Sequence, residues 1–265
     1  MDHWIMSRKG QQLNIKTSGK YIEPRRKIIP GINLLPMPFS ISLTTMERYD
    51  LTIKSIEQVL DDTRISDIVL LDDASTNGDY ERLRDYYQNI PKVRVIRQLW
   101  RKGMSVNKKD AVALARNSHT VLFDSDNILD PTYLNVMEGI ILDEKTIYLP
   151  SKAAPNFDFT AFSGLTFDKR NIKEYLDQPM FDVALNACNY VCPVEEYTRV
   201  FEEDTSVKET DTLYFAYLWL KEGNQFHFVK DMEYFHLVGP QSGWLQNAQY
   251  NLKKAEEIKK IIKTL

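Results

Sequence analysis

The chain has 265 residues, of which 43% are hydrophobic and 27% charged, with a formal net charge of −3. This composition supports a packed core and excludes a wholly disordered chain, and no apolar run approaches the roughly 20 residues of a transmembrane helix. Residues 1–38 carry a net +5 and residues 249–265 a net +3, so the segment between them carries −11. An acidic body argues against a nucleic acid partner and favours a divalent cation.

The charge pattern divides the chain into three parts. Residues 1–38 form a basic N-terminal arm interrupted by prolines, residues 39–248 form the main domain, and residues 249–265 have the spacing of a basic amphipathic C-terminal helix. The polar start lacks the apolar segment of a secretory signal. Cys188 and Cys192 are too close to suggest a framework disulfide, so we expect two thiols in a reducing, cytoplasmic compartment.

The predicted elements of the first half alternate between strand and helix. Apolar runs and helical periods predict strands over 39–45, 67–73, 92–97 and 120–123, and helices over 49–61, 79–89 and 106–117. Such strand-then-helix units predict an α/β fold with a parallel sheet. Beyond Pro150 we expect a strand over 157–167, a helix over 210–222 and a strand over 225–229.

Carboxylates follow two of the predicted strands. Asp72 and Asp73 end the second strand, and Asp124 and Asp126 follow the fourth. Ligands of parallel sheets bind beyond the carboxyl ends of the strands. The Asp124–Asp126 pair suits one hard cation, Mn²⁺ or Mg²⁺, or a cation plus a ribose, although Asp-x-Asp also occurs in ordinary turns. Asp72 and Asp73 suit either a uracil N3–H and a ribose hydroxyl, or a helix cap and turn.

Two later residues are further candidates. Asp211 opens the predicted helix over 210–222, where it serves either as a general base or as a favourable charge at a helix N-terminus. His236 follows a predicted strand and precedes a loop containing Gly239. A lone histidine is more often structural, but imidazole is also a sound third ligand for Mn²⁺.

The order of these motifs resembles the GT-A-fold glycosyltransferases, specifically family-2-like enzymes. The resemblance covers about residues 39–244 and depends on Thr44-Thr45-x-x-Arg48, Asp72-Asp73-Ala-Ser75, Gly103, Asp124-Ser125-Asp126, Glu209-Thr-Asp211 and Tyr-Phe-His236. It implies a single GT-A domain, Rossmann-like in its nucleotide-binding half, with a mostly parallel central sheet flanked by helices. It also implies inverting, metal-dependent transfer from a nucleoside-diphosphate sugar, with a UDP-sugar favoured.

The resemblance assigns roles to individual residues. Its donor-binding positions are Thr44, Arg48, Asp72, Asp73, Lys108, Asp124 and Ser125. Asp72 and Asp73 match positions that hold the base and ribose, and Lys108 falls where many members place a diphosphate-contacting Arg. Asp124 and Asp126 match the metal motif, with Asp126 the direct ligand and His236 the C-terminal one. Asp211 matches the catalytic base.

The sequence departs from the family pattern at three motifs. Where the family usually has Asn-x-Gly, this chain has Arg101-Lys-Gly103, and the frequent Arg-Asn of the next helix is replaced by Lys108-Lys109. The base motif is Glu209-Thr-Asp211, whereas the family has Glu and Asp next to each other. These departures leave the donor open, and the acceptor is a glycan, a lipid-linked molecule or a protein. Residues 186–190 and 239–244, including Trp244, are expected near the acceptor, and the loop over 237–248 is expected to order over bound donor.

Two alternatives stand beside this interpretation, and the placement of the C-terminal helix is a separate question. The Asp124-Ser-Asp126 run also resembles the nucleophile motif of haloacid-dehalogenase-type phosphatases, and a GT-A fold also suits a non-catalytic module that binds nucleotide-sugar or glycan. The C-terminal helix over 250–265 either packs onto the domain or a second copy in a homodimer, which we favour, or lies peripherally on an anionic membrane.

Overall fold

The apolar segments of the first half form parallel strands, as predicted. The computed structural model describes residues 38–237, 239 and 242–265, so the N-terminal arm lies almost wholly outside the described residues. The first four strands are β1 (Phe39–Thr45), β2 (Ile65–Asp72), β3 (Val93–Arg97) and β4 (His119–Asp124). They lie in the order β3-β2-β1-β4 and are all parallel, so their carboxyl ends meet at one edge.

The second half continues the same sheet with mixed strand directions. It adds β5 (Thr146–Ala154), β6 (Phe157–Asp158), β7 (Thr166–Phe167), β8 (Tyr190–Pro193) and β9 (Gln225–Phe235). β8 lies antiparallel between β4 and β5, β9 is parallel to β5, and β7 is antiparallel to β9. The mixed α/β fold is confirmed, but the sheet is wholly parallel only over its first four strands.

The prediction of one strand over 157–167 is wrong. Two short strands, β6 and β7, flank a 3₁₀ turn, η2 (Thr160–Phe162). The chain turns because the Asp158 carboxylate accepts hydrogen bonds from the Thr160 amide and hydroxyl, and Gly164 adopts a left-handed φ of 80°. β5 was not predicted because it contains Pro150, which the sheet accommodates where the β5–β9 register shifts.

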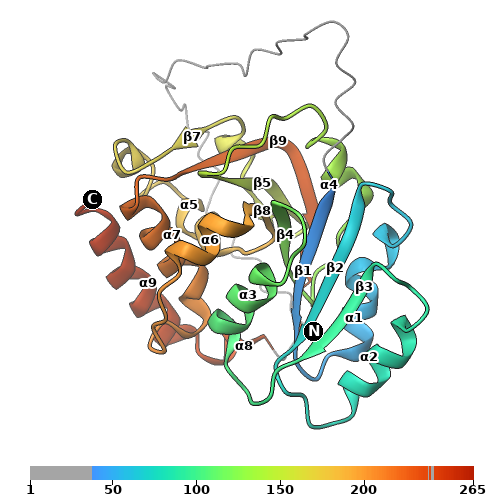
Figure 1. Ribbon diagram of the computed structural model, residues 1–265. Coiled ribbons are helices and arrows are strands. Elements are labelled where there is room, and N and C mark those ends of the chain that lie inside the picture. The colour runs from blue at the N-terminus through green and yellow to red at the C-terminus, as the bar shows by residue number, and fades with distance from the viewer. Residues whose placement is uncertain (1–37, 238, 240–241) are drawn as a thin grey trace, which may run out of the picture.

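Helices cover both faces of the sheet. Figure 1 shows α1 and α2 on one side and α3, α6 and α7 on the other. Their bounds are α1 (Tyr49–Ile56), η1 (Glu57–Val59), α2 (Asp79–Tyr87), α3 (Met104–Ala113), α4 (Pro131–Asn135), η3 (Ile172–Glu174), α5 (Phe181–Asn186), α6 (Val194–Val200), η4 (Lys208–Thr210), α7 (Asp211–Lys221), α8 (Gly243–Gln246) and α9 (Ala248–Ile262).

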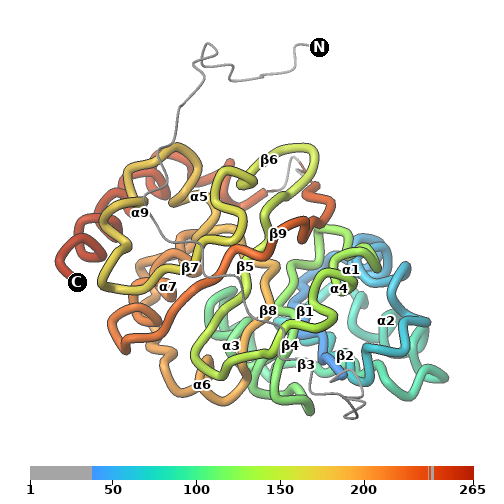
Figure 2. Tube along the Cα trace, turned by 90° about the horizontal axis from the view of Figure 1, so that it is seen from above, coloured from blue at the N-terminus to red at the C-terminus, as the bar shows by residue number. Residues whose placement is uncertain are grey.

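The C-terminal helix α9 packs its apolar face onto the domain. Ala255, Ile258 and Ile262 are buried, and the helix lies against α7 and η4. Figure 2 shows α9 beside α5, across the molecule from α1 and α2. An ion pair of 3.3 Å between Lys259 and Asp182 joins α9 to α5. In the described part of the chain no helix has the length and apolarity to cross a bilayer.

Candidate active site

The turn that follows β4 carries the first two candidate metal ligands. Asp124 is the last residue of β4, and its register partner on β1 is Thr44. The Asp124 amide donates to Oδ1 of Asn189 at 2.9 Å, and Asn189 itself adopts a left-handed φ of 74°. Tyr133 donates its hydroxyl to the Asn189 carbonyl at 2.8 Å. These bonds fix the turn, and Asn189 is a contributor that the motifs did not single out.

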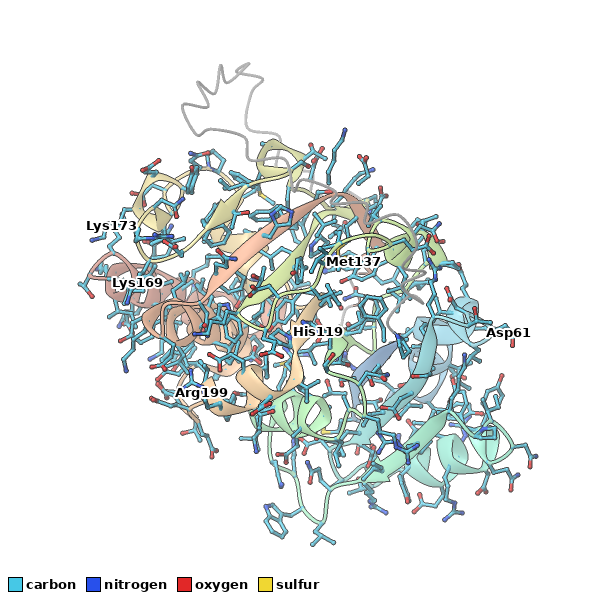
Figure 3. The ribbon with its side chains drawn as sticks, turned by 45° about the horizontal axis from the view of Figure 1, so that its top comes forward. Asp61, His119, Met137, Lys169, Lys173 and Arg199 are labelled. Carbon is cyan, nitrogen blue, oxygen red and sulfur yellow. The ribbon has the colours of Figure 1, made fainter. Side chains whose placement is uncertain are left out.

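The end of β9 is joined to the same turn. The backbones of Ile128 and Phe235 exchange two hydrogen bonds of 2.9 and 3.1 Å. The amide of Leu237 donates to Oδ1 of Asn127 at 3.0 Å. His236 lies between these two connections and is therefore held near the aspartates. His119, by contrast, begins β4 at the strand end opposite Asp124, and Figure 3 shows it within the sheet.

Lys108 lies between two of the predicted site carboxylates. Its Nζ is 3.1 Å from Oδ2 of Asp211 and 3.7 Å from Oδ1 of Asp124, and both Lys108 and Asp211 are buried. Burial lowers the pKa of Lys108, but the charges of Asp211 and Asp124 outweigh it and raise that pKa well above its usual value. Lys108 is therefore a charged ammonium that joins α3, the turn after β4 and the start of α7.

Asp211 is positioned by the segment before its helix. Asn186, the last residue of α5, donates its amide to the carbonyl of Glu209 at 3.1 Å and accepts a bond from the Leu213 amide at 3.1 Å. Burial raises the pKa of Asp211, and the Lys108 ammonium opposes that shift. The 186–190 segment thus positions two site residues. Asn186 holds the backbone around Asp211, and Asn189 holds the backbone of Asp124.

Asp126 is paired with a cation from the segment after β1. Nη1 of Arg48 lies 2.6 Å from Oδ2 of Asp126, and both side chains are partly exposed. Burial and the charge of Asp124 raise the pKa of Asp126, and Arg48 opposes them. The hydroxyl-bearing neighbour Ser125 is buried, and its carbonyl accepts a bond from Ser55 at 2.8 Å. The carboxylates of Asp124 and Asp126 repel each other, so a cation bound between them would be stabilised.

Asp72 and Asp73 are buried and have partners within the protein. Asp72 accepts bonds from the amide and hydroxyl of Ser75, and burial raises its pKa. Asp73 accepts the backbone amides of Lys102 at 2.7 Å and Gly103 at 3.0 Å. The structure therefore gives both residues a turn-forming role, and their contact with a base and ribose stays a prediction.

The third candidate ligand, His236, has one ring nitrogen engaged. Nδ2 of Asn156 donates to Nδ1 of His236 at 3.0 Å and to the His236 carbonyl at 2.8 Å. With Nδ1 accepting, a neutral ring carries its proton on Nε2, which then has no lone pair for a metal. Burial lowers the pKa of His236, which favours the neutral ring. Among the described residues, no three His, Cys, Asp or Glu side chains form a group that could hold a metal.

A cleft adjoins this turn. It has a volume of about 520 Å³ and is lined by Met46, Glu47, Arg48, Asn77 and Gln246. Glu47 has a left-handed φ of 55°, and its carboxylate accepts the Thr76 hydroxyl at 2.9 Å. Gln246 belongs to α8, so the described part of the 237–248 loop already borders the cleft; residues 238, 240 and 241 lie outside the described residues. Trp244, which was expected near the acceptor, is half-buried, and its carbonyl accepts a hydrogen bond from Nδ2 of Asn251.

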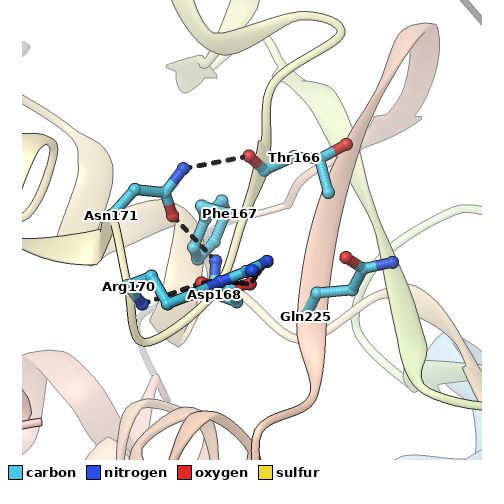
Figure 4. A pocket seen from close by; sticks show the side chains of 6 residues that line it. All are labelled: Thr166, Phe167, Asp168, Arg170, Asn171 and Gln225. Carbon is cyan, nitrogen blue, oxygen red and sulfur yellow. Dashed lines mark hydrogen bonds and ion pairs between the residues drawn. The ribbon is translucent and has the colours of Figure 1, made fainter. Parts of the chain in front are cut away.

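A second hollow lies elsewhere. It measures about 220 Å³ and is drawn in Figure 4, lined by Thr166, Phe167, Asp168, Arg170, Asn171 and Gln225. Gln225 begins β9 and His236 follows its end, so the strand's rise of about 3.3 Å per residue places the hollow roughly 30 Å from the aspartates. Asp168 is already paired with Arg170 there. The cleft beside Arg48 is the hollow that belongs to the candidate site.

Solved structures with the same fold bind nucleotide-sugars. S. aureus TarS 1-349 in complex with UDP-GlcNAc matches with a TM-score of 0.64 at 15% identity, covering 85% of this chain and 65% of that one. Mannosyltransferase PcManGT from Pyrobaculum calidifontis, in complex with GDP-Man and Mn²⁺, matches with a TM-score of 0.60 at 16% identity, covering 86% and 65%. These likenesses establish the GT-A fold of the chain.

Sequence comparison identifies the family. An uncharacterised protein of Sinorhizobium fredii, y4gI, is 35% identical over 86 residues, which are 31% of this chain and 10% of that relative. The chain thus spans about a tenth of the length of this curated relative. The model of glycosyl transferase family 2 matches residues 40–188, more than half of the chain. That match removes the phosphatase alternative, and the chain belongs to glycosyl transferase family 2.

Proposed function

We propose that this protein transfers a sugar from a nucleoside-diphosphate sugar to an acceptor hydroxyl, with inversion and with the assistance of a divalent metal. The observation that carries the proposal is the meeting of Asp124, Asp126, Asp211 and Lys108 at one edge of the sheet, beside a cleft, in a family 2 chain. The acceptor is a hydroxyl of a glycan, a lipid-linked molecule or a protein.

The cleft beside Arg48 is the proposed donor site. Its volume of about 520 Å³ suits a nucleotide, and it lies beyond the carboxyl end of β1, where ligands of such sheets bind. Arg48 lines this cleft and pairs with Asp126, and the buried Lys108 lies 3.7 Å from Asp124. The positive charges of both residues suit the negative charge of a diphosphate. A UDP-sugar is the favoured donor, as in the complex of TarS.

The two aspartates of the turn fit a divalent cation. Asp124 and Asp126 are partly exposed, supply hard oxygen ligands and repel each other, and Mg²⁺ or Mn²⁺ takes its remaining ligands from water and substrate phosphates. His236 joins them only if its contact with Asn156 is released. A bound cation would neutralise the diphosphate and so improve it as a leaving group.

Asp211 is the proposed general base. It takes the proton of the acceptor hydroxyl as that oxygen attacks the anomeric carbon on the face opposite the diphosphate, which inverts the configuration. Lys108 lies 3.1 Å from the Asp211 carboxylate, and its charge opposes the rise in the pKa of Asp211 that burial causes. Residues of α8 at the cleft limit the entry of water, which would otherwise hydrolyse the donor.

The test is a thermal-shift screen of UDP-, GDP- and other nucleotide-sugars, with and without Mn²⁺. We expect a rise in the melting temperature that requires both the metal and one nucleotide, because a ligand that binds only the folded state stabilises it. Adding an acceptor should then release nucleoside diphosphate. Binding without any release, across a broad panel of acceptors, would instead favour the non-catalytic binding module.

A further inference from the structure

We propose that the loop joining β3 to α3, residues 98–104, docks this protein onto the surface of an anionic lipid bilayer. Leu99 is 90% exposed and Trp100 is 63% exposed, and Met104 is exposed beside them. Isolated apolar side chains are common on protein surfaces, but three within six residues form a concentrated patch. This docking does not depend on the proposed transfer reaction.

The base of the loop is fixed, so the apolar tip is held outward. The Asp73 carboxylate accepts the backbone amides of Lys102 and Gly103, and Lys102 Nζ pairs with Asp110 at 2.7 Å. Gly103 has a left-handed φ of 85°, with open space where a Cβ would lie. A loop held in one conformation loses little entropy when it binds a surface.

The charge around the tip matches an anionic surface. Apart from the buried Lys108, residues 98–110 contain Arg101, Lys102 and Lys109 against the single acid Asp110, with which both lysines pair. Arg101 is exposed, and among the described residues it forms no ion pair. An apolar tip with a tryptophan and adjacent cations is the combination that favours the headgroup region of anionic membranes. A soluble glycan is a poorer match, because Leu99 and Met104 offer no hydrogen bonds to sugar hydroxyls.

The position of the loop agrees with this role. It projects beyond the carboxyl ends of the strands, at the lower edge in Figure 1, which is also the edge that carries the candidate site. Contact through this loop would bring the cleft close to the bilayer surface. The alternative contact through α9 is less suitable because Ala255, Ile258 and Ile262 are already buried against the domain.

The experiment is co-sedimentation of the full chain with phosphatidylcholine vesicles, with and without phosphatidylglycerol. We expect binding that requires phosphatidylglycerol and falls roughly 100-fold in Leu99→Ser/Trp100→Ser, since both side chains leave the hydrocarbon boundary. Arg101→Glu should also weaken vesicle binding, and added salt should weaken the binding of the wild type to the same vesicles. Trp100→Phe should retain most binding but lose the vesicle-induced blue shift of tryptophan emission.

Two matched variants serve as controls. Ile141→Ser removes another 80% exposed apolar side chain, and Leu252→Ser alters the exposed face of α9. Both should bind vesicles as the wild type does. The proposal is overturned if the wild type does not bind, if the loop variants bind undiminished, or if Leu252→Ser alone abolishes binding. If the wild type does not bind vesicles and Trp100→Ala loses transfer to a soluble acceptor, the loop instead contacts a glycan.

Discussion

Replacing Lys108 by methionine tests the buried ion pair at the centre of the site. Methionine keeps most of the length of the side chain but removes the ammonium that lies 3.1 Å from Asp211 and 3.7 Å from Asp124. Asp211 is buried, so water has little access to its carboxylate. The substitution therefore leaves a carboxylate in the interior without its cation.

The expected cost follows from the distance. Two unit charges 3.1 Å apart attract by about 5 kcal/mol at an effective dielectric constant of about 20. Desolvation of both charges offsets much of this attraction, but removal of one partner alone costs about 3–5 kcal/mol because the other charge stays buried. We expect Lys108→Met to lower the free energy of unfolding by about 3 kcal/mol. Adding Asp211→Asn should recover more than about 1 kcal/mol.

Urea unfolding followed by tryptophan fluorescence measures these differences. Lys109→Met is the matched control on the same helix: its partner Asp110 lies 3.2 Å away, but both side chains are partly exposed. We expect the control to cost less than about 1 kcal/mol, as for surface ion pairs generally. If Lys108→Met costs no more than Lys109→Met, or if its effect adds independently to that of Asp211→Asn, the buried pair is not formed in the protein.

Three further predictions concern the proposed reaction. Asp211→Asn should lower kcat by roughly 10²–10⁴-fold while donor binding persists, and equal loss of donor binding would contradict a base role. A base acts only when deprotonated, and burial raises the pKa of Asp211, so the acid limb of the rate profile should lie at higher pH than an ordinary aspartate would give. Lys108→Met should move this acid limb to still higher pH. Asn189→Gly keeps the left-handed backbone but removes the 2.9 Å hydrogen bond to the Asp124 amide, so calorimetry should show weaker Mn²⁺-dependent donor binding. Asn186→Ala is the contrasting variant, and it should lower kcat instead because Asn186 contacts the segment before Asp211.

The local pattern was sufficient to predict most elements of the first half. Runs of apolar residues placed β1, β2, β3 and β4 within a few residues, because β1, β2 and β4 are almost wholly buried and β3 is a short segment rich in Val and Ile. The pattern was insufficient after Pro150. There β5 contains a proline at a register shift, and a strand-like apolar run over 157–167 is broken by the Asp158–Thr160 turn.

The positions of Asp124, Asp126 and Asp211 in the predicted elements were sufficient to expect them near one another, but not to predict their partners. Asp124 and Asp126 were placed by the end of a predicted strand, and Asp211 by the start of a predicted helix. Asn127, Asn156 and Asn189 gave no such signal, because a single asparagine in a loop resembles any other turn residue. Their roles depend on contacts with segments far away in the chain, such as that between Asn127 and Leu237.

The amino-acid sequence by itself determined the order of strands and helices in the first half, the acidic centre between basic ends, and the placement of aspartates at strand ends. These follow from hydrophobic periodicity and composition, which act over a few neighbouring residues. Only the tertiary structure decided which charges meet. Lys108 and Asp211 are 103 residues apart, and they form a pair because the packing of α3 against α7 brings their charges within 3.1 Å in the interior. Long-range packing of this kind leaves no mark in the local pattern of either segment.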